Sequence, residues 1–217
     1  MRVKLFSELN TLLFPVRCYG CRELGQPICS RCRKLWYPHR YQSQASELLV
    51  FSAIAYSPVA KSILLAAKEE NLKSADKLLI TALTSSVLEL FKKFGSFTLV
   101  PIPSQASANR RRGRDFIAEI TSEVAKECGL SALPLLEHRR RVQDQSKLNI
   151  AGRRENLAMA LTVKAKFQGQ YATEKVVILD DLITTGATIR EANRALNKAG
   201  FQVQAAATAC VALRRRE

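Results

Sequence analysis

No apolar run of membrane-spanning length occurs in these 217 residues, because polar residues interrupt every hydrophobic stretch well before about 20 residues. Near the start, Arg2 and Lys4 precede an apolar stretch, as basic residues do in a signal peptide. However, Ser7 and Glu8 interrupt that stretch, and no small-residue cleavage site follows it. We therefore predict a soluble chain that stays in the cytoplasm and does not insert into a membrane.

Histidine is scarce, which limits the proton-transfer chemistry that the chain can support. The two histidines are His39 and His138, and no residue stands out as the activator of a nucleophile. A general-base role for His138 is not favoured. Internal repeats and low-complexity segments are absent as well. The length allows one well-buried core with a small appendage rather than two large domains.

Acidic residues are few relative to basic ones: 19 Asp and Glu stand against 34 Lys and Arg, which gives a net charge of +15. A surface with this charge attracts anions such as phosphates, nucleic acid or an acidic partner. The total charge does not choose among these ligands. A solvated basic surface that only maintains solubility is the alternative.

Four of the six cysteines form two C-x-x-C pairs near the N-terminus. These pairs are separated by seven residues and comprise Cys18, Cys21, Cys29 and Cys32. The spacing places four thiolates within tetrahedral reach of one ion, and zinc is favoured over disulfides in a chain without a secretion signal. Flanking arginines can offset the negative charge of such a site. Two redox dithiols or a small disulfide-stapled loop are the alternatives.

Hydrophobic periodicity beyond the cysteines indicates strands that alternate with helices. Strands are predicted at 48–56, 97–103, 133–136, 176–179 and 203–213. Helices are predicted at 59–67, 75–94, 115–128, 150–157 and 188–199. This alternation predicts an α/β fold with a parallel sheet. The polar stretch 38–47 lacks apolar periodicity, so we place a boundary there between an N-terminal zinc-binding module (1–45) and a main domain (46–217).

The segment KVVILDDLITTGATIREANRALNKAG carries the most specific signal. Its β-branched strand delivers Asp180 and Asp181 to the strand end, where open α/β sheets bind ligands. The turn that follows opens a helix and favours a phosphate through its backbone N–H groups and hydroxyls: Thr184, Thr185, Gly186, Ala187 and Thr188. The carboxylates suit ribose hydroxyls and can help to hold Mg²⁺. A strand end with acidic caps before an ordinary threonine N-cap is the alternative.

This segment resembles the signature of type I phosphoribosyltransferases, in which a hydrophobic strand and two acidic residues precede T-T-G-x-T. The resemblance implies that Asp180 and Asp181 are the catalytic pair that contacts the ribose of phosphoribosyl pyrophosphate (PRPP), and that residues 184–188 bind its 5′-phosphate. The four-cysteine module and the segments VPIPSQASANRRRGRDF and RRRVQDQSKLNIAGRRENLAMAL are similar to those of the ComF/GntX group. The expected fold is therefore a type I phosphoribosyltransferase-like parallel sheet flanked by helices, with a small N-terminal zinc module.

Within that group, the resemblance implies that the loop meeting the pyrophosphate contains Arg111, Arg112 and Gly113. Residues 114–116 depart from the group's usual pattern at this point. Residues 145–156 resemble a flexible loop that closes over PRPP, and a surface loop without chemistry is the alternative.

The resemblance also bears on partners, because ComF relatives are associated with natural transformation and DNA uptake. It implies single-stranded DNA and a DNA-translocating ATPase of the competence system as further partners. Two arginine clusters, at 110–114 and 139–141, are expected in loops at one edge of the sheet, where their field attracts a diphosphate or the backbone of DNA. Two hypotheses stay open: a PRPP- and Mg²⁺-dependent transferase that releases pyrophosphate, and a noncatalytic DNA- or partner-binding protein that retains the PRPP site.

Overall fold

The computed structural model describes residues 16–139, 160–169 and 174–213. Its main strands are β1 (Tyr41–Ala45), β2 (Leu48–Ala55), β3 (Thr98–Pro101), β4 (Ser131–Ala132), β7 (Lys175–Ile183) and β8 (Gln202–Val211). They form one sheet in the order β1-β2-β8-β7-β3-β4, in which only the β1–β2 pair is antiparallel. A separate antiparallel pair joins β5 (Leu136–His138) to β6 (Leu161–Val163).

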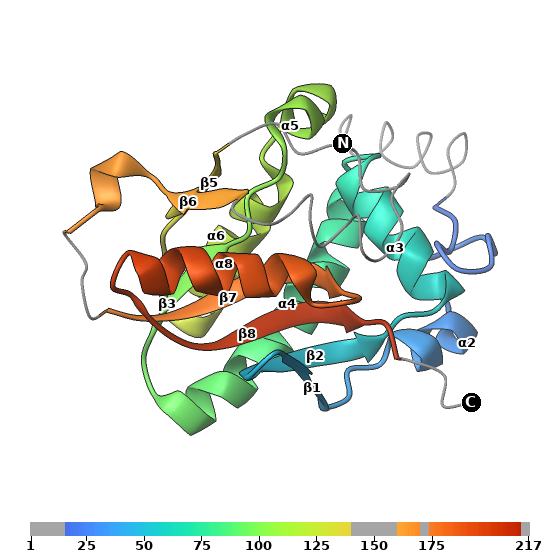
Figure 1. Cartoon of the computed structure of the whole chain (residues 1–217). Coiled ribbons are helices and arrows are strands. Elements are labelled where there is room, and N and C mark those ends of the chain that lie inside the picture. The colour runs from blue at the N-terminus through green and yellow to red at the C-terminus, as the bar shows by residue number, and fades with distance from the viewer. Residues whose placement is uncertain (1–15, 140–159, 170–173, 214–217) are drawn as a thin grey trace.

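Helices cover both faces of the sheet (Figure 1). The helices are α2 (Ser30–Arg33), α3 (Pro58–Lys68), α4 (Lys73–Phe94), α5 (Ala106–Arg112), α6 (Phe116–Cys128) and α8 (Ala187–Lys198), with 3₁₀ turns η1 (Lys34–Trp36) and η3 (Ala165–Phe167). Buried residues of α3, α4 and α6 share one apolar cluster, and those of α8 share another with β5 and β6. The result is a mixed α/β sandwich whose central sheet is covered on both sides, as parallel sheets require.

Strand β7 is the central element that positions the acidic pair. Its residues Val176, Val177, Ile178 and Leu179 are fully buried, so this run of apolar side chains packs against helices on both faces. Leu179 pairs with Ala207 of β8 on one side and with Pro101 of β3 on the other. Asp180 and Asp181 therefore emerge at the carboxyl edge of three adjacent parallel strands.

The cysteine module packs directly against the main sheet and its helices. Its buried Cys18, Ile28 and Trp36 belong to the same apolar cluster as α3 and α4. A Cβ atom on Gly20 would lie 2.6 Å from the Sγ of Cys32 and 2.9 Å from a methyl group of Val59, so only glycine permits this close approach to α3. The division of the chain at residue 45 stays a prediction.

Several predicted elements differ from those observed. The polar stretch 38–47 contains β1, which is a polar strand at the edge of the sheet. In place of the single strand expected at 133–136, the structure has β4 just before this range and β5 beginning at its last residue. Residues 106–112 form α5 where a loop was expected, and β7 continues through the acidic pair to Ile183. The helix predicted at 150–157 lies outside the described residues.

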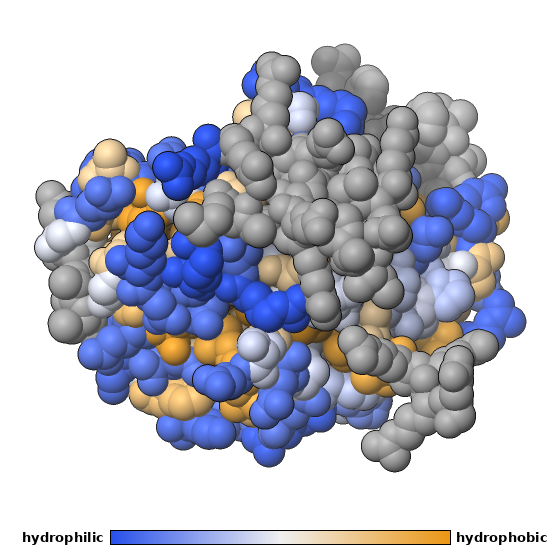
Figure 2. Space-filling view, in the orientation of Figure 1, coloured by the Kyte–Doolittle hydropathy of each residue, from blue (hydrophilic) through white to orange (hydrophobic). Residues whose placement is uncertain are grey.

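The surface agrees with the sequence composition. Hydrophilic side chains dominate the visible face over α8, and hydrophobic ones show there only in small patches (Figure 2). Among the described residues, every helix is too short or too polar to cross a membrane.

Candidate functional site

Two adjacent carboxylates, those of Asp180 and Asp181, lie near the C-terminal end of β7. The Oδ1 atom of Asp180 accepts a hydrogen bond from the backbone N–H of Asp181 at 2.8 Å, which fixes the first side chain against the strand. The side chain of Asp181 is only 12% exposed. Carboxylates held in this way at a strand end are suited to accept hydrogen bonds from hydroxyl groups of a ligand.

A lysine at the end of helix α3 forms an ion pair with the second aspartate. The Nζ atom of Lys68, at the end of α3, donates to Oδ2 of Asp181 at 2.7 Å. Burial opposes the charged form of Lys68, but the two carboxylates outweigh it and raise the pKa of Lys68. No sequence motif indicated this residue.

The two carboxyl groups have opposite pKa shifts. Burial and the charge of Asp181 raise the pKa of Asp180 well above its ordinary value. Burial also acts on Asp181, but the charge and the hydrogen bond of Lys68 outweigh it and lower the pKa of Asp181. Lys68 therefore acts on the two neighbouring carboxyl groups unequally, because it donates its hydrogen bond to Asp181.

The turn after β7 depends on a glycine. Gly186 has φ 72° and serves as the N-cap of α8. A Cβ at this position would lie 3.0 Å from the Cβ of Ala45, so both the backbone conformation and the packing favour glycine.

The start of α8 directs polar groups away from the sheet. The N–H of Ala187 donates to Oγ1 of Thr185 at 3.4 Å, and Arg190 donates to the carbonyl of Thr185 at 2.9 Å. Thr184 is exposed and Thr188 is half-buried in the first turn of α8. Backbone N–H groups at a helix start favour a phosphate, so the geometry fits the predicted role of residues 184–188, which stays a prediction.

The predicted pyrophosphate residues lie at the C-terminal end of α5, not in a loop. Arg112 pairs with Glu69 at 2.6 Å and its side chain is 8% exposed, whereas Arg111 is 69% exposed and 3.4 Å from the same carboxylate. Gly113 ends the helix in the left-handed region, with φ 71°. The charge of Arg112 opposes the protonated form of Lys68, which places this arginine on the side of the acidic pair.

Arg114 does not belong to a surface cluster, contrary to expectation. Its guanidinium binds both carboxylate oxygens of Asp76, at 2.8 and 2.9 Å, and its side chain is 9% exposed. It also donates to the carbonyl of Ala67 and lies 5.0 Å from the ring centre of Phe116. Arg114 therefore joins α3, α4 and α6 internally. Of the second predicted cluster, Arg139 is described and residues 140–141 lie outside the described residues, as does the segment 145–156.

His138 lies away from the acidic pair. Its Nε2 atom is 3.0 Å from the carbonyl oxygen of Pro103, and the residue lines a cavity of about 280 Å³ beside the end of β3. Neither Asp180 nor Asp181 lines this cavity.

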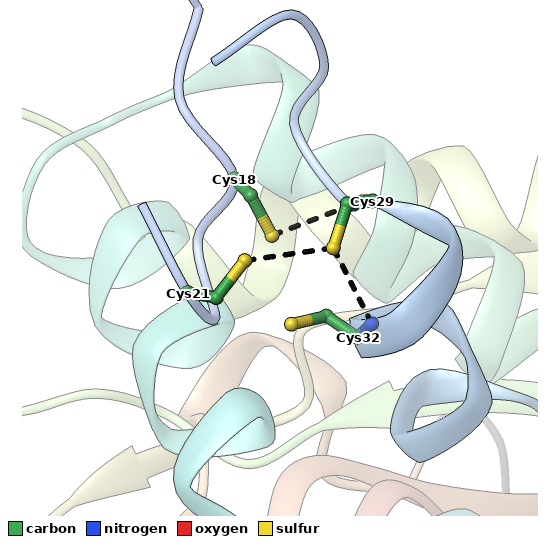
Figure 3. Close-up of side chains that lie close together, drawn as sticks. All are labelled: Cys18, Cys21, Cys29 and Cys32. Carbon is green, nitrogen blue, oxygen red and sulfur yellow. Dashed lines mark hydrogen bonds between the residues drawn. The ribbon is translucent and has the colours of Figure 1, made fainter. Parts of the chain in front are cut away.

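The four predicted cysteines converge on one point (Figure 3). Their Sγ atoms all lie within 4.8 Å of one another, and those of Cys21 and Cys29 are 3.5 Å apart. A tetrahedral zinc ion with bonds of about 2.3 Å requires sulfur separations of about 3.8 Å, so the residues fit this metal. The six cysteines are all described, and none forms a disulfide.

Backbone N–H groups favour the thiolate form of Cys18, whereas burial and the neighbouring sulfurs raise the pKa of Cys32 to about 12. The N–H of Cys29 points to the Sγ of Cys18 at 3.4 Å, and that of Cys32 points to the Sγ of Cys29 at 3.5 Å. Burial opposes ionisation of Cys18, but hydrogen bonds from the backbone outweigh it and lower the pKa of this thiol to about 6. Arg31 contacts Cys21 and adds positive charge beside it.

Comparison with known proteins agrees with this arrangement. A model of the phosphoribosyl transferase domain family matches residues 111–217. Competence protein ComFC of Streptococcus pneumoniae (strain ATCC BAA-255 / R6) is 30% identical over 125 residues, which is 58% of this chain and 53% of that protein. The chain is therefore similar, over its C-terminal part, to phosphoribosyl transferase domains, and it is similar to a ComF-type competence protein. The match spans about half the length of this curated relative.

Solved structures similar to this chain include two adenine phosphoribosyltransferases and a UMP synthase. An adenine phosphoribosyltransferase has 16% identity and a TM-score of 0.45, with 84% of this chain and 89% of that chain covered. The adenine phosphoribosyltransferase of Saccharomyces cerevisiae has 16% identity and a TM-score of 0.43, with 85% and 89% covered. UMP synthase of Leishmania donovani has 16% identity and a TM-score of 0.38, with 82% and 30% covered.

Proposed function

We propose that this protein binds PRPP at the carboxyl edge of β7. Asp180 and Asp181 would accept hydrogen bonds from the ribose 2′- and 3′-hydroxyls, and residues 184–188 would hold the 5′-phosphate at the start of α8. Arg112 would face the pyrophosphate. The observation that carries this proposal is the joint placement of one half-buried and one buried carboxylate, a glycine-dependent turn and the start of a helix.

PRPP would enter with Mg²⁺, which neutralises the diphosphate and stabilises it as a leaving group. The oxygen-rich donors Asp180 and Asp181 suit this hard cation. Lys68 and Arg112 add positive charge on the same side of the site, which favours a ligand that carries several negative charges.

In the transferase form of the proposal, the bond between C1 of the ribose and the pyrophosphate oxygen breaks, and a bond from C1 to the acceptor forms. The pyrophosphate leaves with the bonding electron pair, and the acceptor loses its proton to solvent or to a base. Arginine and lysine side chains stabilise the charge that develops on the leaving group. The alternative is a protein that binds PRPP without turnover and serves DNA uptake or assembly.

Titration calorimetry with PRPP and Mg²⁺ tests the site. Replacing Asp181 or Thr188 with alanine should weaken binding by about 1 to 3 kcal/mol, because each change removes a hydrogen-bond partner of a charged ligand. Thr81→Ala, an exposed site on α4, is the matched control and should bind as the wild type does. Unchanged affinity in both site variants would refute the assignment.

A screen of nucleobases for pyrophosphate release then separates the two functions. Release with one acceptor supports a transferase. Tight PRPP binding without release for any acceptor favours the noncatalytic form.

Single-stranded DNA is a second candidate ligand, supported by the charge of the protein and by exposed arginines. The chain has a net charge of +15, and Arg110 and Arg111 are exposed in the last turn of α5. Binding of this kind would be driven by phosphates and independent of sequence. The relative bears the name of a competence protein, and a DNA-translocating ATPase of such a system is the partner that we would test first.

A further inference from the structure

We propose that Lys68 is a positioning residue of the PRPP site, which holds the carboxylate of Asp181 ionised and oriented for the ribose. This inference rests on the proposed function, because it assigns the ribose to the acidic pair. It concerns a residue of α3, which lies outside every segment that carries the phosphoribosyltransferase resemblance.

The contact is direct and sheltered from solvent. The Nζ of Lys68 lies 2.7 Å from Oδ2 of Asp181, and the two side chains are 30% and 12% exposed. A hydrogen bond to one carboxylate oxygen limits rotation of that carboxylate, and at low exposure the attraction is weakly screened. Since the Oδ1 of Asp180 is fixed by the backbone N–H of Asp181, both members of the acidic pair have a defined orientation.

The surroundings of Lys68 hold it in place. Its Nζ lies 5.9 Å from the ring centre of Phe116, which is 1% exposed, and Arg114 lies against the same ring. Arg114 is itself held in place, because it donates hydrogen bonds to Asp76 and to the carbonyl of Ala67. Ala67 is the residue that precedes Lys68. The backbone at the end of α3 is thus anchored immediately before the lysine.

The residues after Lys68 extend the same network to the predicted pyrophosphate side. Glu69 pairs with Arg112 at 2.6 Å, and the side-chain amide of Asn71 donates to the carbonyl of Arg112 at 2.9 Å. The end of α3 therefore contacts both the ribose side and the pyrophosphate side of the proposed site. Lys68 is the member that contacts the ribose side.

A purely structural salt bridge is the competing explanation. Partly buried ion pairs often contribute little net stability, because desolvation of the charges offsets their attraction. If Lys68 serves only stability, its substitution should lower the affinity for every ligand of the site to a similar degree, because the whole fold is weakened. If Lys68 positions Asp181, its substitution should lower the affinity only for ligands that contact Asp181.

The experiment measures the binding of three probes by calorimetry: PRPP with Mg²⁺, ribose 5-phosphate, and inorganic pyrophosphate without Mg²⁺. Lys68→Met should weaken PRPP and ribose 5-phosphate by about tenfold, the factor expected for loss of one charge-assisted contact. Pyrophosphate should lose less than about threefold, because without Mg²⁺ its binding does not use the acidic pair. Lys68→Arg should restore most of the ribose 5-phosphate affinity, since it keeps the charge.

The control is Lys61→Met, which removes an exposed lysine from the same helix and should leave all three affinities unchanged. Equal losses for ribose 5-phosphate and pyrophosphate, or no rescue by arginine, would overturn the positioning role. A wild-type protein that binds none of the probes would instead refute the proposed function. Wild-type binding with unchanged Lys68→Met would refute the role of Lys68 alone.

Discussion

The two aspartates of the site should respond to the same substitution in opposite ways. Burial and the charge of Asp181 raise the pKa of the Asp180 carboxyl group well above its ordinary value, and Asp180→Asn removes this group. Asp181→Asn instead removes the ion-pair partner of Lys68. We therefore expect Asp180→Asn to stabilise the fold at neutral pH and Asp181→Asn to destabilise it, although both should weaken PRPP binding.

The sign follows from the protons bound by each state. The folded protein binds the proton of Asp180 more tightly than the unfolded chain does, so the stability from this group is complete below about pH 4 and is lost as the pH rises through the folded pKa. Asparagine keeps the acceptor for the N–H of Asp181 but cannot ionise. Each unit of difference in pKa between the folded and the unfolded state is equivalent to about 1.4 kcal/mol, and each kcal/mol gained should raise Tm by about 2 to 4 °C.

For Asp181 the sign is reversed. Its pKa is lowered by Lys68, so its contribution is present above about pH 4 and is lost as the pH falls through the folded pKa. Lys68 is 30% exposed, which reduces the cost of leaving it unpaired to about 1 to 3 kcal/mol.

Urea unfolding followed by circular dichroism between about pH 2 and pH 8 measures both effects. The difference between Asp180→Asn and the wild type should grow as the pH rises above about 4. The deficit of Asp181→Asn should shrink as the pH falls below about 4. If the two variants lose equal stability, or if neither difference depends on pH, the opposite pKa shifts of Asp180 and Asp181 are wrong.

Three further predictions concern the metal, the turn and the arginines. Purified protein should contain about one zinc per chain by elemental analysis, and Cys29→Ser should lower that content, because a closed four-thiolate shell loses a ligand; zinc-free protein with oxidised cysteines would contradict this. Gly186→Ala should weaken PRPP binding in calorimetry more than Gly169→Ala does, because both glycines have positive φ but only the first has neighbours within 4 Å of an added Cβ. Replacing the exposed arginines at 110–111 with alanine should reduce the anisotropy change of labelled single-stranded DNA and its salt dependence, and equal binding would exclude this end of α5 as a DNA surface.

The sequence predicted the elements that bury apolar side chains. The β-branched run before Asp180 and the periodic pattern of α8 predicted where the acidic pair and the turn that follows it lie, because both patterns arise from burial. Helix α5 was missed because it buries none of its residues and therefore has no apolar period. Strand β1 was missed for a related reason, since its exposed positions carry polar side chains at the edge of the sheet.

The contacts between distant segments were not predictable from local patterns. Lys68 and Asp181 are 113 positions apart, and Arg114 reaches Asp76 over 38 positions. Lys68, Asp76 and Arg114 look like ordinary surface residues in the sequence. Only the packing of α3, α4 and α6 shows that Arg114 is internal, and only the folded chain brings Lys68 into contact with Asp181.

Helix α3 has a consequence for how the two halves of the protein influence each other. Its first turn packs through Val59 against the glycine and cysteine of the thiolate cluster, and its last residue is Lys68. Eleven helical residues span only about 16 Å and bend little, so a shift of the first turn displaces the last one. Oxidation of the thiolates would then act on the acidic pair at a distance, without any change in the residues that contact the ligand.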